Sequence, residues 1–148
     1  MFKERHIYYF RNFKFNNGNE PKDKYFIVLK ETVDNIIIGT LPTRKNKIPS
    51  FVTTNHGCIN IEESMYNCYL FEKNRTICTN GFCFDLPTFI YGSEIEYYSK
   101  EKLANDFNKE GLHFRVQGEL TTDEYNRIVN CLKNSNSVKN GIKKKLSN

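Results

Sequence analysis

The chain has 148 residues and a mass of 17.5 kDa, which fits a single domain. Aromatic residues make up 14% of it, too many for a disordered chain, and no apolar run reaches the roughly 18–20 residues that a bilayer span needs. The net charge is +5, but residues 1–132 carry equal numbers of acidic and basic side chains, so the excess lies in the last sixteen residues. Residues 1–6 are charged and show no export signal, and we therefore expect a compact cytoplasmic protein with no membrane partner.

The first part of the chain predicts three strands. Residues 5–15 alternate aromatic and polar side chains near their end, as a half-buried strand requires. The apolar run within residues 24–31 predicts a strand buried on both faces, and residues 36–41 predict a third strand that Pro42 ends. The polar segment 43–60 is long for a plain connection, and loops of this length tend to be functional or mobile.

The second part predicts further short strands and then helices. A fourth strand is expected at 66–72, and shorter ones around Ile77, 82–84 and 88–91, with the hairpin signal Asn80-Gly81 between them. Leu103 and Phe107, four residues apart, favour a short helix within 99–109, and residues 114–120 return to an extended pattern. Thr121 and the acids after it predict the start of a helix with an apolar stripe, formed by Tyr125, Ile128, Val129 and Leu132.

These elements predict a mainly β fold with appended α-helix, either a small antiparallel barrel or a sandwich. We expect one domain over residues 1–134 and a basic C-terminal tail over 135–148, in which no amphipathic stripe is clear. The tail lysines would hold nucleic acid phosphates or an acidic partner, or would only keep a solvated terminus soluble.

The cysteines indicate reduced thiols more than a metal site. Their number, five, is odd, and the chain shows no export signal, which favours free thiols in the cytosol. A zinc site drawn from His56 and the nearby cysteines has poor spacing, because no Cys-x-x-Cys pair occurs and Cys78-x₄-Cys83 has no second pair to match it. We therefore expect no metal and no cofactor.

The order of these elements resembles that of the PemK/MazF family of toxins. The resemblance covers residues 5–132 as a pattern: a hydrophobic strand, a Gly/Asn loop, a basic residue leading into residues 26–29, an Ile-rich strand that ends near Thr43, and residues 118–121 followed by a helix. Where the family commonly has an Arg-Pro pair this chain has Lys24-Tyr25, and the family's Thr or Ser after the third strand aligns best with Thr43, followed by Arg44.

The resemblance implies an SH3-like antiparallel barrel with a C-terminal helix, commonly a homodimer. It also implies a toxin that cleaves single-stranded RNA without a metal ion and is restrained by an antitoxin protein.

Such cleavage needs a base for the 2′-hydroxyl proton, a cation for the pentacovalent phosphorane, and an acid for the leaving 5′-oxygen. Arg44 is the candidate cation, Thr43 would position the phosphate, Lys24 would act as a second cation or proton donor, and His56 is the conventional acid or base. The structural alternative for each is an ordinary exposed or inert residue at a strand end or in a loop.

RNA binding would use cations and aromatic faces for stacking. The cationic candidates are Arg11, Lys14, Lys22, Lys45 and Lys47, and the stacking candidates are Tyr8, Tyr9, Tyr25, Tyr91, Tyr97 and Tyr98. Tyrosines in a small barrel also serve simply as core or rim packing.

Two other functions remain open. One is a non-catalytic barrel module that binds protein or nucleic acid, or a toxin with a protein target, which the missing Arg-Pro pair and the neutral body favour. The other is a structural protein of a mobile element.

Overall fold

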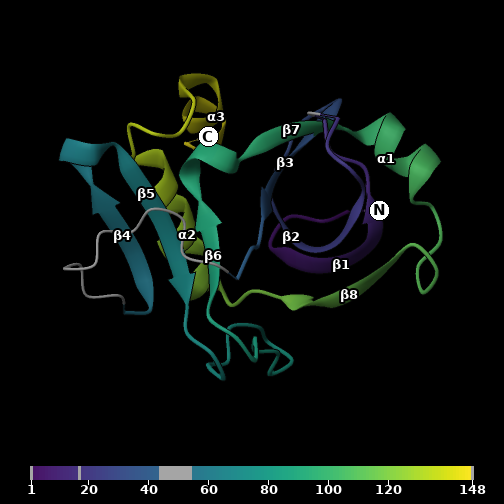
Figure 1. Cartoon of the computed structure of the whole chain (residues 1–148), viewed down its shortest axis with the longest axis horizontal. Helices are drawn as coiled ribbons and strands as arrows, with labels where there is room; N and C mark the ends of the chain where they lie inside the picture. Colours follow the sequence, from purple (N-terminus) through teal and green to yellow (C-terminus); the bar gives the residue numbers. More distant parts are fainter. Residues whose placement is uncertain (1, 17, 44–54, 148) are drawn as a thin grey trace.

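The computed structural model describes residues 2–16, 18–43 and 55–147 (Figure 1). In this part of the chain eight strands form two antiparallel sheets, and three α-helices accompany them. The mainly β fold with appended helices is therefore confirmed. The strands do not close into a single barrel.

The larger sheet has five strands in the order β7-β3-β2-β1-β8. Their bounds are β1 His6–Phe13, β2 Lys22–Glu31, β3 Asn35–Thr40, β7 Glu96–Ser99 and β8 Phe114–Glu119. β2 pairs with β1 from Lys22 to Ile27, whereas its pairing with β3 begins only at Phe26, opposite Thr40. The sheet curls strongly around the first two strands (Figure 1).

The smaller sheet has three strands in the order β4-β5-β6, with bounds β4 Gly57–Ile61, β5 Tyr66–Phe71 and β6 Thr88–Tyr91. Two short 3-10 helices, η1 Glu62–Ser64 and η2 Gly92–Glu94, lie between β4 and β5 and between β6 and β7. β7 follows η2 directly, so this one stretch of chain passes from the smaller sheet to the larger.

Three helices complete the fold: α1 Lys100–Asp106, α2 Thr122–Lys133 and α3 Asn140–Leu146. The predicted cap of α2 is confirmed, because the Thr121 hydroxyl accepts the Glu124 N–H at 3.2 Å. α2 packs on β4 and β5, and α3 packs on α2. Leu103 and Phe107, the pair predicted for α1, are both buried.

The alternation of side chains along β2 builds two cores. Phe26 and Val28 face an aromatic cluster that α1 closes, and Ile27 and Leu29 face a second core between the two sheets and helices α2 and α3. The predicted burial of this strand on both faces is confirmed. A third, smaller cluster lies on the other face of the three-stranded sheet.

Several expected boundaries are corrected. Within the polar segment 43–60 the structure places strand β4, and it adds β7, which the sequence analysis did not predict. The short strands expected around Ile77 and 82–84 are absent. That region has instead a turn at Gly81, where φ is +88°, and a single bridge from Cys78 to Leu120.

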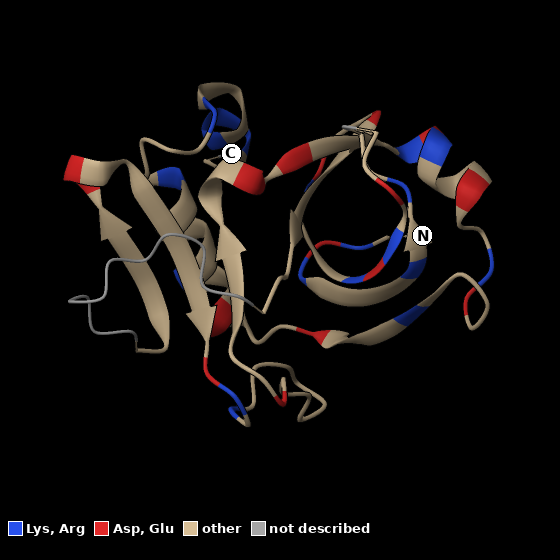
Figure 2. Ribbon diagram, viewed as in Figure 1, with Lys and Arg blue, Asp and Glu red and all other residues tan. Residues whose placement is uncertain are grey.

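The C-terminal segment is also corrected, because it contains α3. Val138, Ile142 and Leu146 are buried in the core between the sheets, while Lys144 and Lys145 are exposed. The basic side chains of α3 are visible in Figure 2. The segment expected as a solvated tail therefore contributes apolar side chains to the fold.

Candidate functional site

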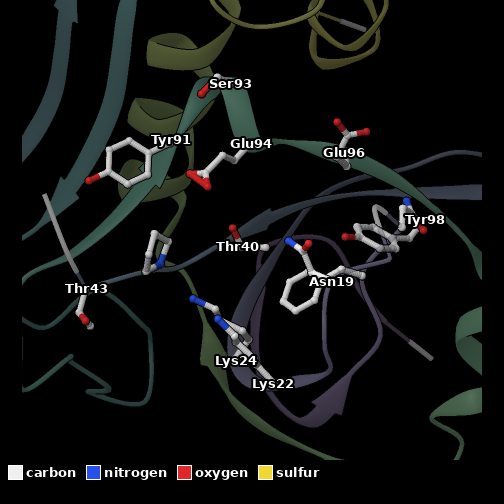
Figure 3. A pocket seen from close by; sticks show the side chains of 13 residues that line it. Asn19, Lys22, Lys24, Thr40, Thr43, Tyr91, Ser93, Glu94, Glu96 and Tyr98 are labelled. Carbon is white, nitrogen blue, oxygen red and sulfur yellow. The ribbon is translucent and has the colours of Figure 1, made fainter. Parts of the chain in front are cut away.

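A pocket of about 680 Å³ lies where the two sheets meet, beside the half of β2 that β3 does not cover. This volume is within the range of roughly 300–1,000 Å³ that is usual for ligand sites. Its walls come from the loop after β1, from β2, from the end of β3 and from the chain that runs from β6 to β7 (Figure 3). The lining residues are Phe15, Asn16, Asn19, Lys22, Lys24, Thr40, Pro42, Thr43, Tyr91, Ser93, Glu94, Glu96 and Tyr98.

Two lysines form the basic side of this pocket. Lys22 and Lys24 are two residues apart on β2, so strand alternation places both side chains on the same face. Because β3 ends at Thr40, this half of β2 is paired on one side only, by β1. Figure 3 shows both side chains reaching into the pocket from β2. The pocket thus contains two predicted catalytic residues, Lys24 and Thr43, and one predicted RNA-binding residue, Lys22.

Thr43 lies at the rim, where the chain leaves β3. Leu41 N–H donates to the Tyr25 carbonyl at 3.1 Å, and the Pro42 carbonyl accepts the Phe89 N–H at 2.9 Å. These two bonds fix the backbone that leads into Thr43, which is exposed. The structure therefore brings Lys24 and Thr43 to one pocket. Arg44, Lys45 and Lys47 lie outside the described residues.

Two carboxylates on the opposite wall were missed by the sequence analysis. Glu94 ends η2 and is exposed at the pocket. Glu96 begins β7, and its Oε1 accepts from Lys139 Nζ at 2.5 Å. The signal that could have found Glu96 is the alternation of Glu96 and Tyr98 on one face of a short strand.

Tyr98 supplies a hydroxyl at the inner wall of the pocket. Burial is the main cause that raises the pKa of Tyr98; Glu96 raises it further, and a backbone hydrogen bond at Asn16 opposes them. The phenol is therefore neutral at physiological pH. The pocket combines ammonium groups, two carboxylates and hydroxyl groups, a set that can bind a phosphate and move protons.

His56 lies outside this pocket, in a buried network. Its side chain is 2% exposed, its Nε2 lies 2.8 Å from Glu124 Oε2, and its Nδ1 accepts the Glu72 N–H at 3.1 Å. The Tyr69 hydroxyl donates a short hydrogen bond to the same Glu124 oxygen. Because Nδ1 is an acceptor, Nε2 carries the proton and donates to Glu124. Both ring nitrogens are thus engaged within the fold.

The other two predicted RNA-binding residues lie apart from the pocket. Arg11 lines a shallower hollow on the opposite face of the larger sheet, and Lys14 is exposed just after β1. Of the stacking candidates, Tyr8, Tyr91 and Tyr98 are buried, whereas Tyr9, Tyr25 and Tyr97 are partly exposed.

The cysteines correct another expectation. Cys58 in β4 and Cys131 in α2 form a disulfide, so the prediction that all thiols are reduced is wrong for this pair. Cys68, Cys78 and Cys83 are free. Burial is the main cause that raises the pKa of the Cys68 thiol to about 11 and that of Cys78 to about 12, which makes both poor nucleophiles.

Within the residues described, no cluster of three or more His, Cys, Asp or Glu side chains is arranged to hold a metal ion. No helix of this part of the chain is both long and apolar enough to cross a membrane. Comparison with protein-family models, curated proteins and solved structures finds no match to this chain.

Proposed function

We propose that the chain is a toxin-like endoribonuclease that cleaves single-stranded RNA in the pocket between the two sheets, without a metal ion. The observation that carries the proposal is the meeting of Lys22, Lys24 and Thr43 in one pocket of suitable volume, opposite Glu94. The proposed scaffold is the curled five-stranded sheet. An SH3-like barrel would be the closed form of such a sheet.

In the proposed reaction the 2′-oxygen attacks the adjacent phosphorus, and the bond from phosphorus to the 5′-oxygen breaks. Glu94 takes the 2′-hydroxyl proton, Lys22 stabilises the phosphorane charge, and Lys24 gives a proton to the leaving 5′-oxygen. Thr43 positions the phosphate, and Arg44, the candidate cation of the sequence analysis, is proposed to stabilise this charge together with Lys22. The products are a 2′,3′-cyclic phosphate and a 5′-hydroxyl. His56 is given no part, because it is enclosed and both of its nitrogens are engaged.

The test is incubation of a mixed-sequence single-stranded RNA with the protein in EDTA. We expect cleavage to fall at least about 100-fold in Lys24→Ala and in Glu94→Gln, because each removes one partner of the proton transfers. Lys102→Ala, which removes an exposed lysine of α1, is the matched control and should cleave like the wild type. Intact RNA with the wild-type protein, or equal cleavage in all four proteins, would reject the nuclease.

A partner antitoxin and a homodimer belong to the same proposal. The lysines of α3 and of the end of α2 form a basic surface (Figure 2). Acidic side chains of the antitoxin would bind to this surface.

A non-catalytic binding module, or a toxin with a protein target, is the second candidate. The observation that favours it is the charge of the pocket, in which Glu94 and Glu96 offset Lys22 and Lys24. RNA that binds but stays intact in the same assay would favour a nucleic-acid-binding module, and a protein target is favoured if RNA does not bind.

A further inference from the structure

A row of three side chains crosses the larger sheet on the face opposite the lysine pocket. Tyr25 of β2 is paired in register with Tyr9 of β1, and Tyr9 is paired with Arg115 of β8. The two tyrosine rings lie 4.8 Å apart between centroids, and Arg115 Cζ lies 5.7 Å from the Tyr9 centroid. Cross-strand neighbours of this kind share one face of a sheet.

At this row the side chains on this face of the sheet become more exposed to solvent. Ile7 and Ile27 lie on the same face and are fully buried in the core under α2, whereas Tyr9 and Tyr25 are only partly buried. On the far side of Tyr25, the buried Phe84 ring packs against it, with 5.3 Å between the ring centroids. The result is a pair of neighbouring tyrosine rings on β1 and β2 that is partly exposed to solvent, with Arg115 of β8 beside it.

Two guanidinium groups, of Arg11 and Arg115, lie beside the row, and Asp23 and Asp85 are the acidic groups near it. A hollow of about 620 Å³ is lined by Tyr9, Arg11, Asn12, Asp23, Tyr25 and Arg115. Asp23 is its carboxylate, and Asp23 Oδ1 accepts the Asn12 N–H at 2.9 Å. Over the part of the chain that the structure describes, neither Arg11 nor Arg115 has a carboxylate at salt-bridge distance. Two guanidinium groups beside two aromatic faces are complementary to phosphates and bases of a single strand.

We propose that Tyr9, Tyr25 and Arg115 form a stacking subsite for bases of single-stranded RNA, with Arg11 binding a neighbouring phosphate. This inference rests on the proposed function, since it assigns a second contact to the same substrate. Alternation along β2 places Lys22 and Lys24 on one face, and Asp23 and Tyr25 on the other. Because β3 ends before this half of β2, an RNA strand that passes the uncovered edge reaches both faces.

The probe is a ten-nucleotide oligouridine in which every sugar is 2′-O-methylated, so that it binds but provides no 2′-hydroxyl for cleavage. We expect Tyr9→Ala to weaken its binding about 5- to 150-fold, the usual loss for one stacked base, and Tyr9→Phe to bind nearly as the wild type. Arg115→Ala should weaken binding, and Arg11→Ala, which removes the proposed phosphate contact, should also make binding less dependent on salt. Val116→Ala, at an exposed residue on the other face of β8, is the control and should not change binding.

A spectroscopic readout separates stacking from a structural role. The chain contains no Trp, so Tyr9→Trp introduces a single indole into the row. We expect its fluorescence to be quenched when the oligouridine binds, as happens when a base stacks on the ring.

Binding that is unchanged in Tyr9→Ala, with unquenched Tyr9→Trp fluorescence, would overturn the subsite even if the protein cleaves unmodified RNA. Loss of binding in Tyr9→Ala with quenching in Tyr9→Trp supports the subsite, even if unmodified RNA stays intact and the nuclease is rejected. Failure of the wild-type protein to bind the oligouridine would overturn the subsite as well.

Discussion

Glu124 is a carboxylate that is only 6% exposed and receives two hydrogen bonds, from the Tyr69 hydroxyl and from His56 Nε2. Removing a partner of a buried charge leaves that charge or its donors unsatisfied. We expect Glu124→Ala to lower the free energy of unfolding by about 3–5 kcal/mol and Tyr69→Phe by about 1.5–3 kcal/mol. Urea denaturation at neutral pH measures both.

The neighbouring exposed acid supplies the control. Asp123 pairs with Arg127 on the surface of α2, so Asp123→Asn should change stability by less than about 0.5 kcal/mol. Losses in Glu124→Ala no larger than in this control would contradict the network. Burial is the main cause that raises the pKa of Tyr69 above its usual value. The Tyr69 contribution is therefore complete below about pH 10 and is lost as the pH rises through its folded pKa.

The contacts of single residues also show what could not be predicted from the sequence. His56 is conspicuous as a titratable loop residue, but its partners Glu124 and Tyr69 are separated from it by 68 and 13 positions. Glu124 follows the pattern of an ordinary first-turn helix acid, and Tyr69 that of an ordinary strand aromatic. Only the packing of α2 against the smaller sheet brings the three together, and no local pattern encodes that contact.

At the scale of elements, segments with a marked apolar or periodic pattern could be predicted, including the short β6 and α1, whereas β7 and α3 could not. β2 has four consecutive buried apolar residues, and α2 has a capped stripe, so each is evident in the sequence. β7 has only four residues, and α3 has seven, which include Gly141 and three lysines. A helix so short, with Asn140 and Gly141 in its first turn, is stabilised by tertiary packing, which local propensity does not express.

The buried side chains of α3 give the test of that explanation. Ile142 is 1% exposed in the core between the sheets, whereas Lys144 points to solvent. We expect Ile142→Ala to lower the free energy of unfolding by about 2–5 kcal/mol and Lys144→Ala to change it by less than about 0.5 kcal/mol. Chemical denaturation of the two variants measures the difference. Equal stability would mean that the segment does not pack as described and is the solvated tail expected from its composition.

At the scale of the whole molecule, the antiparallel β class could be predicted, but the division into two sheets could not. The turns between successive strands indicate neighbours in sequence, and β1, β2 and β3 pair in that order. β8 pairs with β1 and β7 with β3 across long stretches of chain, and these registers depend on which faces the cores bury. The lysine pocket lies at the junction of the two sheets. Its acidic wall could not be predicted, because the sequence pattern does not show how the sheets meet.

The disulfide acts on the whole molecule because it joins residues 73 positions apart, in β4 of the smaller sheet and in α2. Closing a loop of this length restricts the unfolded chain, and we expect the bond to contribute about 2–4 kcal/mol to the free energy of unfolding. Dithiothreitol should therefore lower the urea midpoint of the wild type and leave that of Cys58→Ser unchanged. Cys83→Ser, which removes a free thiol, should respond to the reductant like the wild type.

Thiol labelling of the denatured chain should find three reactive cysteines without reductant and all five with it. Five reactive cysteines in the untreated protein would show that Cys58 and Cys131 remain reduced, and the stability difference should then vanish.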